Sequence, residues 1–191
     1  MPKFERFSAS NIFHHMLSAL FCAIVYFYAY KLNIFLFDDL KFSDGISWVF
    51  IPMGLRVLLV LIFVETGALG IFIGSLFFYY LNGSQDDHVF NIVSGLISAG
   101  APLLARYIAV DNFKLDINLS QITLKPLLEI TAIFALITAL FRSMWLYWYG
   151  KSDAFIEGAF VMFVGNFIGA LMVLSTAAVT LKIYRSATEK L

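Results

Sequence analysis

One stretch limits what this chain can fold into more than any other. Ser47–Tyr80 is apolar almost throughout its 34 residues and carries a single arginine, Arg56. About twenty apolar residues cross the hydrocarbon core of a bilayer as a helix. The stretch therefore predicts two short membrane passes, with the chain reversing at residues 65–67.

The entry to this stretch contains two residues that weaken a helix. Pro52 cannot donate a backbone hydrogen bond, and Gly54 is flexible, so we expect the first pass to be kinked or unwound there. Irregular backbone at membrane depth is tolerated where it is buried in protein or lines a cavity. Arg56 follows, and a guanidinium near the midplane costs at least about 2.5 kcal/mol. We therefore expect Arg56 to be satisfied by several partners inside the bundle.

The composition places the whole chain in a membrane. Of its 191 residues, 61% are hydrophobic and the mean hydropathy is +0.85, whereas soluble domains are about 45 to 50% apolar. The net charge is zero, which argues against nucleic-acid binding. The sequence contains no metalloprotease, nucleophile-elbow or phosphate-loop motif. We expect neither catalysis, nor a metal, nor a cofactor.

The apolar segments predict an all-α fold, a polytopic membrane helix bundle in one transmembrane domain. About six helices are expected, the second of them broken, at residues 12–37, 47–64, 67–81, 89–110, 126–148 and 154–181.

Six passes place both termini on one side of the membrane. Eight of the thirteen Lys and Arg residues then lie on that side: Lys3, Arg6, Arg106, Lys114, Lys125, Lys182, Arg185 and Lys190. Cytoplasmic loops are enriched in Lys and Arg, so both termini are predicted to be cytoplasmic. Arg142 falls near the opposite interface, where we expect it to snorkel among neighbouring aromatic residues.

The residues around the predicted break form a candidate ligand site. Asn166, in the last segment, lies at about the same depth as Arg56, so the two side chains can meet. Such a contact is either a structural tie or part of a site for a small anionic ligand, because a helix break beside an arginine suits an anionic group. The candidate ligand-binding residues are Trp48, Pro52, Gly54, Arg56 and Asn166.

Pairs of small residues four apart let membrane helices approach closely. Three such pairs stand out: Ala19 with Ala23, Gly70 with Gly74, and Gly165 with Gly169. Each pair can pack helices within the chain or against another protein. We predict that Ala19 and Ala23, or Gly70 and Gly74, pack against another integral membrane protein, because the chain contains no cytosolic module that could transmit a signal.

Three stretches resemble the bacterial membrane-associated sensor domains of the MASE type. They are WVFIPMG at Trp48–Gly54, GALGIFIGSLF at Gly67–Phe77 and VGNFIGALMVL at Val164–Leu174, where Asn166 stands in place of an acidic residue of that family. The resemblance implies a stand-alone sensor-like subunit of the bacterial inner membrane that acts through a partner protein.

A second class is similar in size and number of passes. The substrate-capturing components of energy-coupling-factor vitamin importers dock their partner through an Ala-x-x-x-Ala motif, which Ala19-Leu-Phe-Cys-Ala23 matches. That resemblance implies a ligand site near the outer face. A site at Arg56 that opens outward past Trp48 would suit this class.

Overall fold

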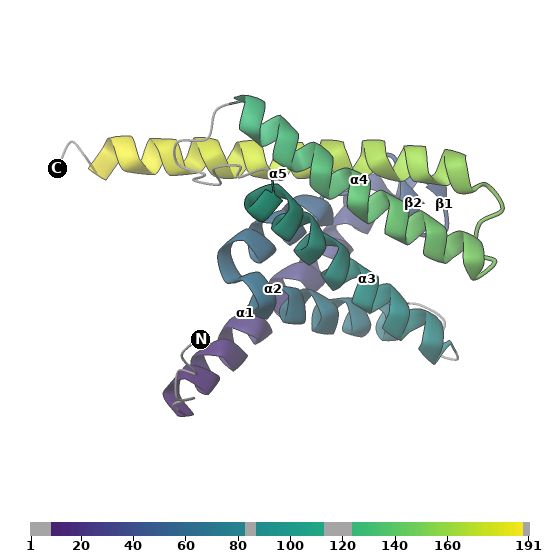
Figure 1. Cartoon of the computed structure of the whole chain (residues 1–191), viewed down its shortest axis with the longest axis horizontal. Coiled ribbons are helices and arrows are strands. Elements are labelled where there is room, and N and C mark those ends of the chain that lie inside the picture. The colour runs from purple at the N-terminus through teal and green to yellow at the C-terminus, as the bar shows by residue number, and fades with distance from the viewer. Residues whose placement is uncertain (1–8, 83–86, 113–123, 189–191) are drawn as a thin grey trace.

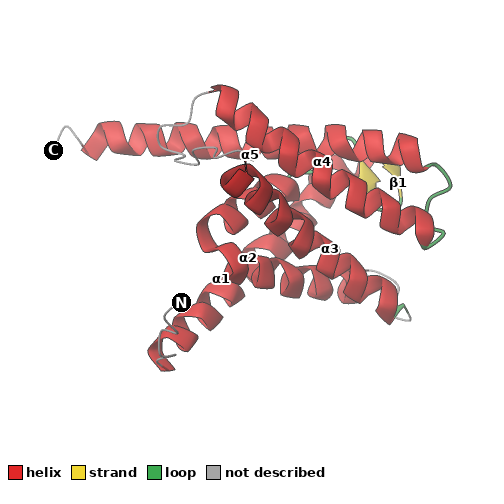
Figure 2. Cartoon of the chain, viewed as in Figure 1, coloured by secondary structure: helices red, strands yellow, loops and turns green. Residues whose placement is uncertain are grey.

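The computed structural model of the chain is built almost entirely of helices (Figure 1, Figure 2). It describes residues 9–82, 87–112 and 124–188. The elements in chain order are α1 (Ala9–Phe37), the 3-10 turn η1 (Asp38–Leu40), β1 (Lys41–Ser43), β2 (Ile46–Ser47), α2 (Pro52–Asn82), α3 (His88–Tyr107), the π-helical turn η2 (Ile108–Asn112), α4 (Leu124–Trp148) and α5 (Phe155–Thr188).

Five helices in the described part of the chain are long and apolar enough to cross a membrane. They leave large apolar side chains exposed, including Phe35, Trp148 and Ile156, as expected of a surface that faces lipid. The prediction of an all-α membrane helix bundle is confirmed. The predicted count of six helices is corrected to five, because residues 52–82, which cover most of the second and third predicted segments, form α2 without an intervening loop.

Helix α2 is nevertheless sharply bent, at Val64, where φ is 50° and ψ is −117°. The bend divides it into a first arm, Pro52–Phe63, and a second arm, Glu65–Asn82. At 1.5 Å per residue the first arm is about 18 Å long, well short of the roughly 30 Å of bilayer hydrocarbon. The chain therefore does break close to the predicted reversal, but it turns on one residue.

Contacts with α1 show the direction of the two arms. The first arm runs antiparallel to α1: the backbone N–H of Ile51, just before it, donates to Asn33 at 2.8 Å, and Phe63 at its end packs on Phe21. The second arm runs parallel to α1. Thr66 lies 3.1 Å from His15, and Phe78, further along, stacks on Tyr30. Helix α2 is thus a helical hairpin folded against α1.

The two predicted small-residue pairs of α1 and α2 meet each other. A Cβ atom added at Gly74 would lie 2.6 Å from the carbonyl oxygen of Ala23, and one added at Gly70 would lie 2.7 Å from that of Ala19. We call these four residues the seam. Both alanines are buried, 3% and 5% exposed, so the seam is a contact within the chain. This corrects the prediction that these residues pack against another protein.

The third pair, Gly165 and Gly169 of α5, admits the extended chain that precedes α2. The backbone N–H of Phe50 donates to the carbonyl of Gly165 at 3.1 Å, and a side chain at either glycine would collide with the backbone of Ser47 or Phe50. Pro52 is the first residue of α2, where its missing N–H costs nothing. Residues 47–51 were expected to be helical and are extended instead.

The two ends of the bundle differ. Helix α1 begins and α5 ends at one end, which we call the termini end, and β1 and β2 lie at the other, the hairpin end (Figure 1). The strands pair antiparallel across Asp44 and Gly45, and Gly45 has a φ of 80°. The sequence analysis placed no strands here, although Asp-Gly between short apolar runs is a hairpin signal. Residues 3, 6, 114 and 190, used to predict orientation, lie outside the described residues.

Candidate functional site

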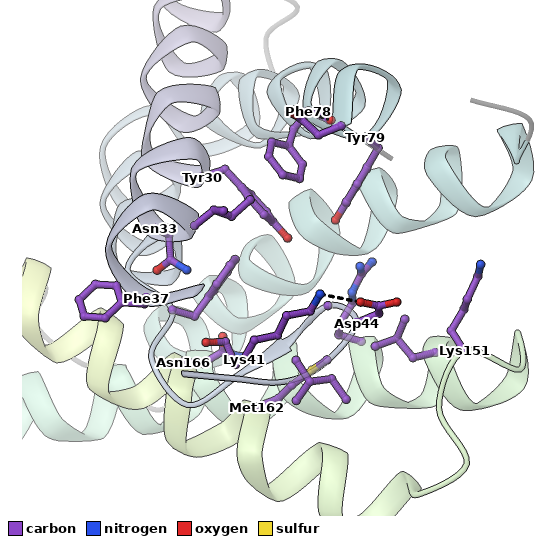
Figure 3. Close-up of a pocket in the computed structure, with 18 of the residues that line it drawn as sticks. Tyr30, Asn33, Phe37, Lys41, Asp44, Phe78, Tyr79, Lys151, Met162 and Asn166 are labelled. Atoms are coloured by element: carbon purple, nitrogen blue, oxygen red, sulfur yellow. Dashed lines mark hydrogen bonds and ion pairs between the residues drawn. The ribbon is translucent and has the colours of Figure 1, made fainter. Parts of the chain in front are cut away.

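A cavity of about 400 Å³ lies at the hairpin end, where it is lined by the β-hairpin and by side chains from all five long helices (Figure 3). The volume is within the range of small-molecule sites, about 300 to 1,000 Å³. Tyr30 and Asn33 line it from α1, and Phe78 and Tyr79 from the second arm of α2. Its charged and polar lining also includes Asp38, Lys41, Asp44, Arg56, Asn82, Asn91, Thr138, Arg142, Lys151 and Asn166.

Arg56 reaches this cavity from the first arm of α2. It is 5% exposed. Its Nε donates to the hydroxyl of Tyr26 at 2.8 Å and its Nη2 to that of Ser98 at 3.2 Å. The guanidinium also lies 5.2 Å from the ring centres of Tyr26 and Phe50. The interior supplies neutral partners, as a buried guanidinium requires, but in the described chain it forms no ion pair with a carboxylate.

Arg142 approaches the same cavity from α4. Its guanidinium lies 5.5 Å from the ring centre of Tyr79 and 5.7 Å from that of Phe90, and it is close to Gly45 of the β-hairpin. Its Nη1 atom is buried and has no hydrogen-bond partner among the described residues. The expectation that Arg142 snorkels to the outer interface is therefore wrong: the side chain turns inward, over aromatic rings.

A second buried group in the lining also lacks a partner. Thr138, one turn before Arg142 on α4, is 2% exposed, and no described residue satisfies its hydroxyl oxygen. An unsatisfied buried polar group costs about 1 to 3 kcal/mol. Two such groups facing one cavity indicate that something polar belongs in it.

The cavity mouth carries charges that compensate each other. Lys41 Nζ lies 2.6 Å from Asp44, and both side chains are largely exposed. The hydrogen bond with Asp44 raises the pKa of Lys41, and the same bond lowers the pKa of Asp44. Asp38 and Lys151 are exposed as well. Lys151 lies over the ring of Phe90 at 5.6 Å and, like Arg56 and Arg142, has no carboxylate partner within ion-pair distance in the described chain. The two deeper unpaired cations of the lining are Arg56 and Arg142.

The predicted ligand-binding residues fall into two groups. Arg56 and Asn166 both line the cavity, although no hydrogen bond joins them in the described chain. Trp48, Pro52 and Gly54 do not line it. Trp48 packs on Phe42 at the surface, and Gly54 packs against Gly169 of α5. The prediction of a kink at Pro52 and Gly54 is wrong: they begin the regular first arm of α2, which carries Arg56, and neither lines the cavity.

Sequence reasoning missed Arg142, Thr138 and the tyrosines as members of one site. Their spacing carries a weak signal: Thr138 and Arg142 are four residues apart, as are Gly74 and Phe78, which places each of these pairs on one helix face. The part of the chain that the structure describes gathers no group of three metal-ligating His, Cys, Asp or Glu side chains.

Comparison of the chain with protein-family models, with curated proteins and with solved structures gives no match. The chemistry of the cavity is therefore the basis on which a function is proposed.

Proposed function

We propose that this chain is a non-enzymatic membrane subunit that binds a small anionic ligand in the cavity at the hairpin end and acts through a partner membrane protein. The observation that carries the proposal is Arg142: its guanidinium is turned inward, and one buried nitrogen has no partner in the described chain. A carboxylate or phosphate group would supply both the hydrogen bonds and the opposite charge that this nitrogen lacks.

The electrostatics of the cavity favour an anion over a cation or a neutral ligand. Arg56 and Arg142 lie among aromatic rings, where the local dielectric is low and an uncompensated charge is costly. The carboxylates of the lining, on Asp38 and Asp44, are exposed at the mouth, and Asp44 is held by Lys41. An anion that entered past Lys151 at the mouth would meet the two deeper cations, Arg56 and Arg142, and no buried carboxylate of the described lining.

The location proposed for this subunit is the bacterial inner membrane, with both termini in the cytoplasm. The cavity lies at the end opposite the termini, so in this orientation it would open to the outside. That arrangement suits a sensor-like subunit that detects an external solute, in keeping with the MASE-type resemblance of Trp48–Gly54.

The second candidate is the substrate-capturing component of an importer. An outward cavity of this volume favours it. The buried seam disfavours it, because Ala19 and Ala23, which match the docking motif of that class, are covered by Gly70 and Gly74. We therefore rank the sensor-like subunit first.

The test is thermal unfolding of the full chain in lipid nanodiscs with and without small anions. Acetate, butyrate, succinate and inorganic phosphate are compared with acetamide and butyramide at equal ionic strength. A ligand at 100 times its Kd stabilises the native state by about 2.7 kcal/mol, a clear rise in Tm. We expect at least one anion to raise the Tm and the amides to leave it unchanged. If no anion of the panel stabilises the protein, the proposed function is wrong.

A further inference from the structure

We infer that the ligand is an organic dianion, with one acidic group at Arg56 and the other at Arg142, joined by a short apolar skeleton. This inference rests on the proposed function and specifies the ligand class. It follows from the cavity having two separate cationic positions, each built by different residues.

Each arginine has its own aromatic frame. The guanidinium of Arg56 lies 5.2 Å from the ring centres of both Tyr26 and Phe50, and that of Arg142 lies 5.5 Å from Tyr79 and 5.7 Å from Phe90. At Arg56 the hydroxyls of Tyr26 and Ser98 accept from Nε and Nη2, so an acidic group would approach the remaining nitrogen, Nη1. At Arg142 it would approach the unpartnered Nη1.

A single acidic group would compensate one of these charges and leave the other. The two arginines come from different helices, α2 and α4, and both are within electrostatic range of Tyr79, which lines the wall between them. Nothing anionic in the described lining reaches either guanidinium within ion-pair distance. Arg56 is buried and Arg142 is half-buried, and a cation withdrawn from water without a counter-charge is destabilising. Two anionic groups on one ligand satisfy both.

The wall between the arginines indicates what joins the two groups. Tyr30 and Phe78 stack with ring centres 3.9 Å apart, and both line the cavity, as does Met162. In Figure 3 the side chains of Tyr30 and Tyr79 point into the cavity from α1 and α2. Such a surface favours a carbon skeleton over a further charged group.

A zwitterion such as an amino acid fits the cavity less well. Its ammonium group would need a carboxylate, and both carboxylates of the described lining lie at the mouth. Asp44 has a side chain that is 86% exposed and already pairs with Lys41, and Asp38 is exposed. The interior of the cavity therefore selects for negative charge at both ends of the ligand.

The experiment compares matched ligands on the unmodified chain in nanodiscs by titration calorimetry. The probes are the straight-chain dicarboxylates of four to seven carbons and the monoamide of each, which keeps size and shape and removes one charge. One charge-assisted contact is worth about 10- to 100-fold in affinity. We expect the best dicarboxylate to bind at least tenfold more tightly than its monoamide.

Two variants assign the preference to the arginines. Arg142→Gln is expected to remove the difference between dicarboxylate and monoamide, whereas Lys182→Gln, on the exposed end of α5 away from the cavity, is expected to keep it. The comparison on the unmodified chain stands even if Arg142→Gln does not fold. If a dicarboxylate and its monoamide bind with equal affinity, the inference that the ligand is a dianion is wrong, and the proposal that the cavity binds an anion stands. Absence of binding by every probe overturns both proposals.

Discussion

The seam is built by α1 and the second arm of α2, and the same two helices line part of the cavity, yet the two regions are packed in opposite ways. Toward the termini end, Ala19 and Ala23 meet Gly70 and Gly74, and the backbones touch. Toward the hairpin end the same parallel pair carries aromatic side chains, and Tyr30 stacks on Phe78 with ring centres 3.9 Å apart. The backbones of this helix pair are thus in contact toward the termini end, whereas aromatic side chains lie between the two helices toward the hairpin end.

The difference is one of side-chain volume. Small residues permit close backbone contact and strong van der Waals packing in lipid, where the hydrophobic effect does not draw helices together. Large rings hold the helices apart and leave room that polar groups then line. A helix pair that changes from small to aromatic residues along its length therefore forms a wedge, with stability concentrated in the seam and ligand binding in the cavity.

The largest expected effect comes from forcing the seam apart with a large side chain. Gly74→Leu would force its Cβ to within 2.6 Å of the carbonyl oxygen of Ala23, so the two backbones must separate. Overpacking of a tight core costs about 1 to 3 kcal/mol or more, and we expect the upper end here because the obstacle is backbone. In nanodiscs the Tm should fall by about 6 to 12 °C.

Gly100→Leu is the matched control for this prediction. Gly100 is also a helix glycine, but nothing lies within 4 Å of an added Cβ, so the same substitution should leave the Tm nearly unchanged or raise it. Equal losses of stability at Gly74 and Gly100 would mean that the seam is not a close contact.

The second prediction concerns the unsatisfied hydroxyl of the cavity. Thr138→Val keeps the shape of the side chain and removes a buried polar atom that has no described partner. The unliganded chain should therefore gain about 1 kcal/mol, a rise in Tm of about 2 to 4 °C, and should lose affinity for the anion. Both changes are measured in the nanodisc unfolding assay, without and with ligand.

Thr131→Val separates this effect from a general effect of valine on α4. Thr131 is fully buried two turns earlier, and its hydroxyl donates to the carbonyl of Leu127 at 2.7 Å. Removing a satisfied hydroxyl should bring no gain in stability. If both variants stabilise the chain to the same extent, the hydroxyl of Thr138 has no special role.

The parts of this wedge differ in how far the sequence could predict them. The small pairs and the break near residue 65 were visible, because spacing and apolar length report local geometry. The contact between Ala19 and Gly70 could not be predicted, because a small-residue pair does not show which helix will pack against it. Arg142 was placed at the interface by its depth alone, and its rotation about α4 depends on tertiary packing. The Asp44-Gly45 turn was predictable from its residue types and was missed.

The third prediction tests the bend that folds α2 onto the seam. Val64 is β-branched and has a φ of 50°, a conformation that costs about 1 to 3 kcal/mol for a residue with a Cβ. Val64→Gly should relieve that strain and, after the entropic cost of glycine, raise the Tm by about 1 to 3 °C. Leu69→Gly, at an exposed helical position of the second arm, should lower the Tm instead. If the Tm falls for both variants, Val64 has ordinary helical backbone dihedrals and stores no strain.

The smallest expected effect lies beside the cavity, where α3 begins. Asp87 caps α3 by accepting from the backbone N–H of Phe90 at 3.0 Å, and it accepts from the hydroxyl of Tyr149 at 2.5 Å. The bond from Tyr149 is the main reason that the pKa of Asp87 is lowered, with Lys151 and His88 adding weaker attraction.

Because the folded-state pKa of Asp87 is depressed, its stabilising contribution is present above the unfolded-state pKa of about 4 and is lost as the pH falls through the folded-state value. Asp87→Asn keeps a good helix cap and removes only the charge. The Tm of this variant should therefore lie about 1 to 2 °C below that of the unmodified chain at pH 7, and the two Tm values should converge as the pH falls below 4.

Tyr149→Phe should reduce the difference in Tm between the chains with Asp87 and with Asn at this position at pH 7, because the hydroxyl that favours the carboxylate is gone. A difference between the two chains that persists unchanged from pH 7 to pH 3 would show that the charge of Asp87 does not contribute, and that this edge of the cavity is held by the cap alone.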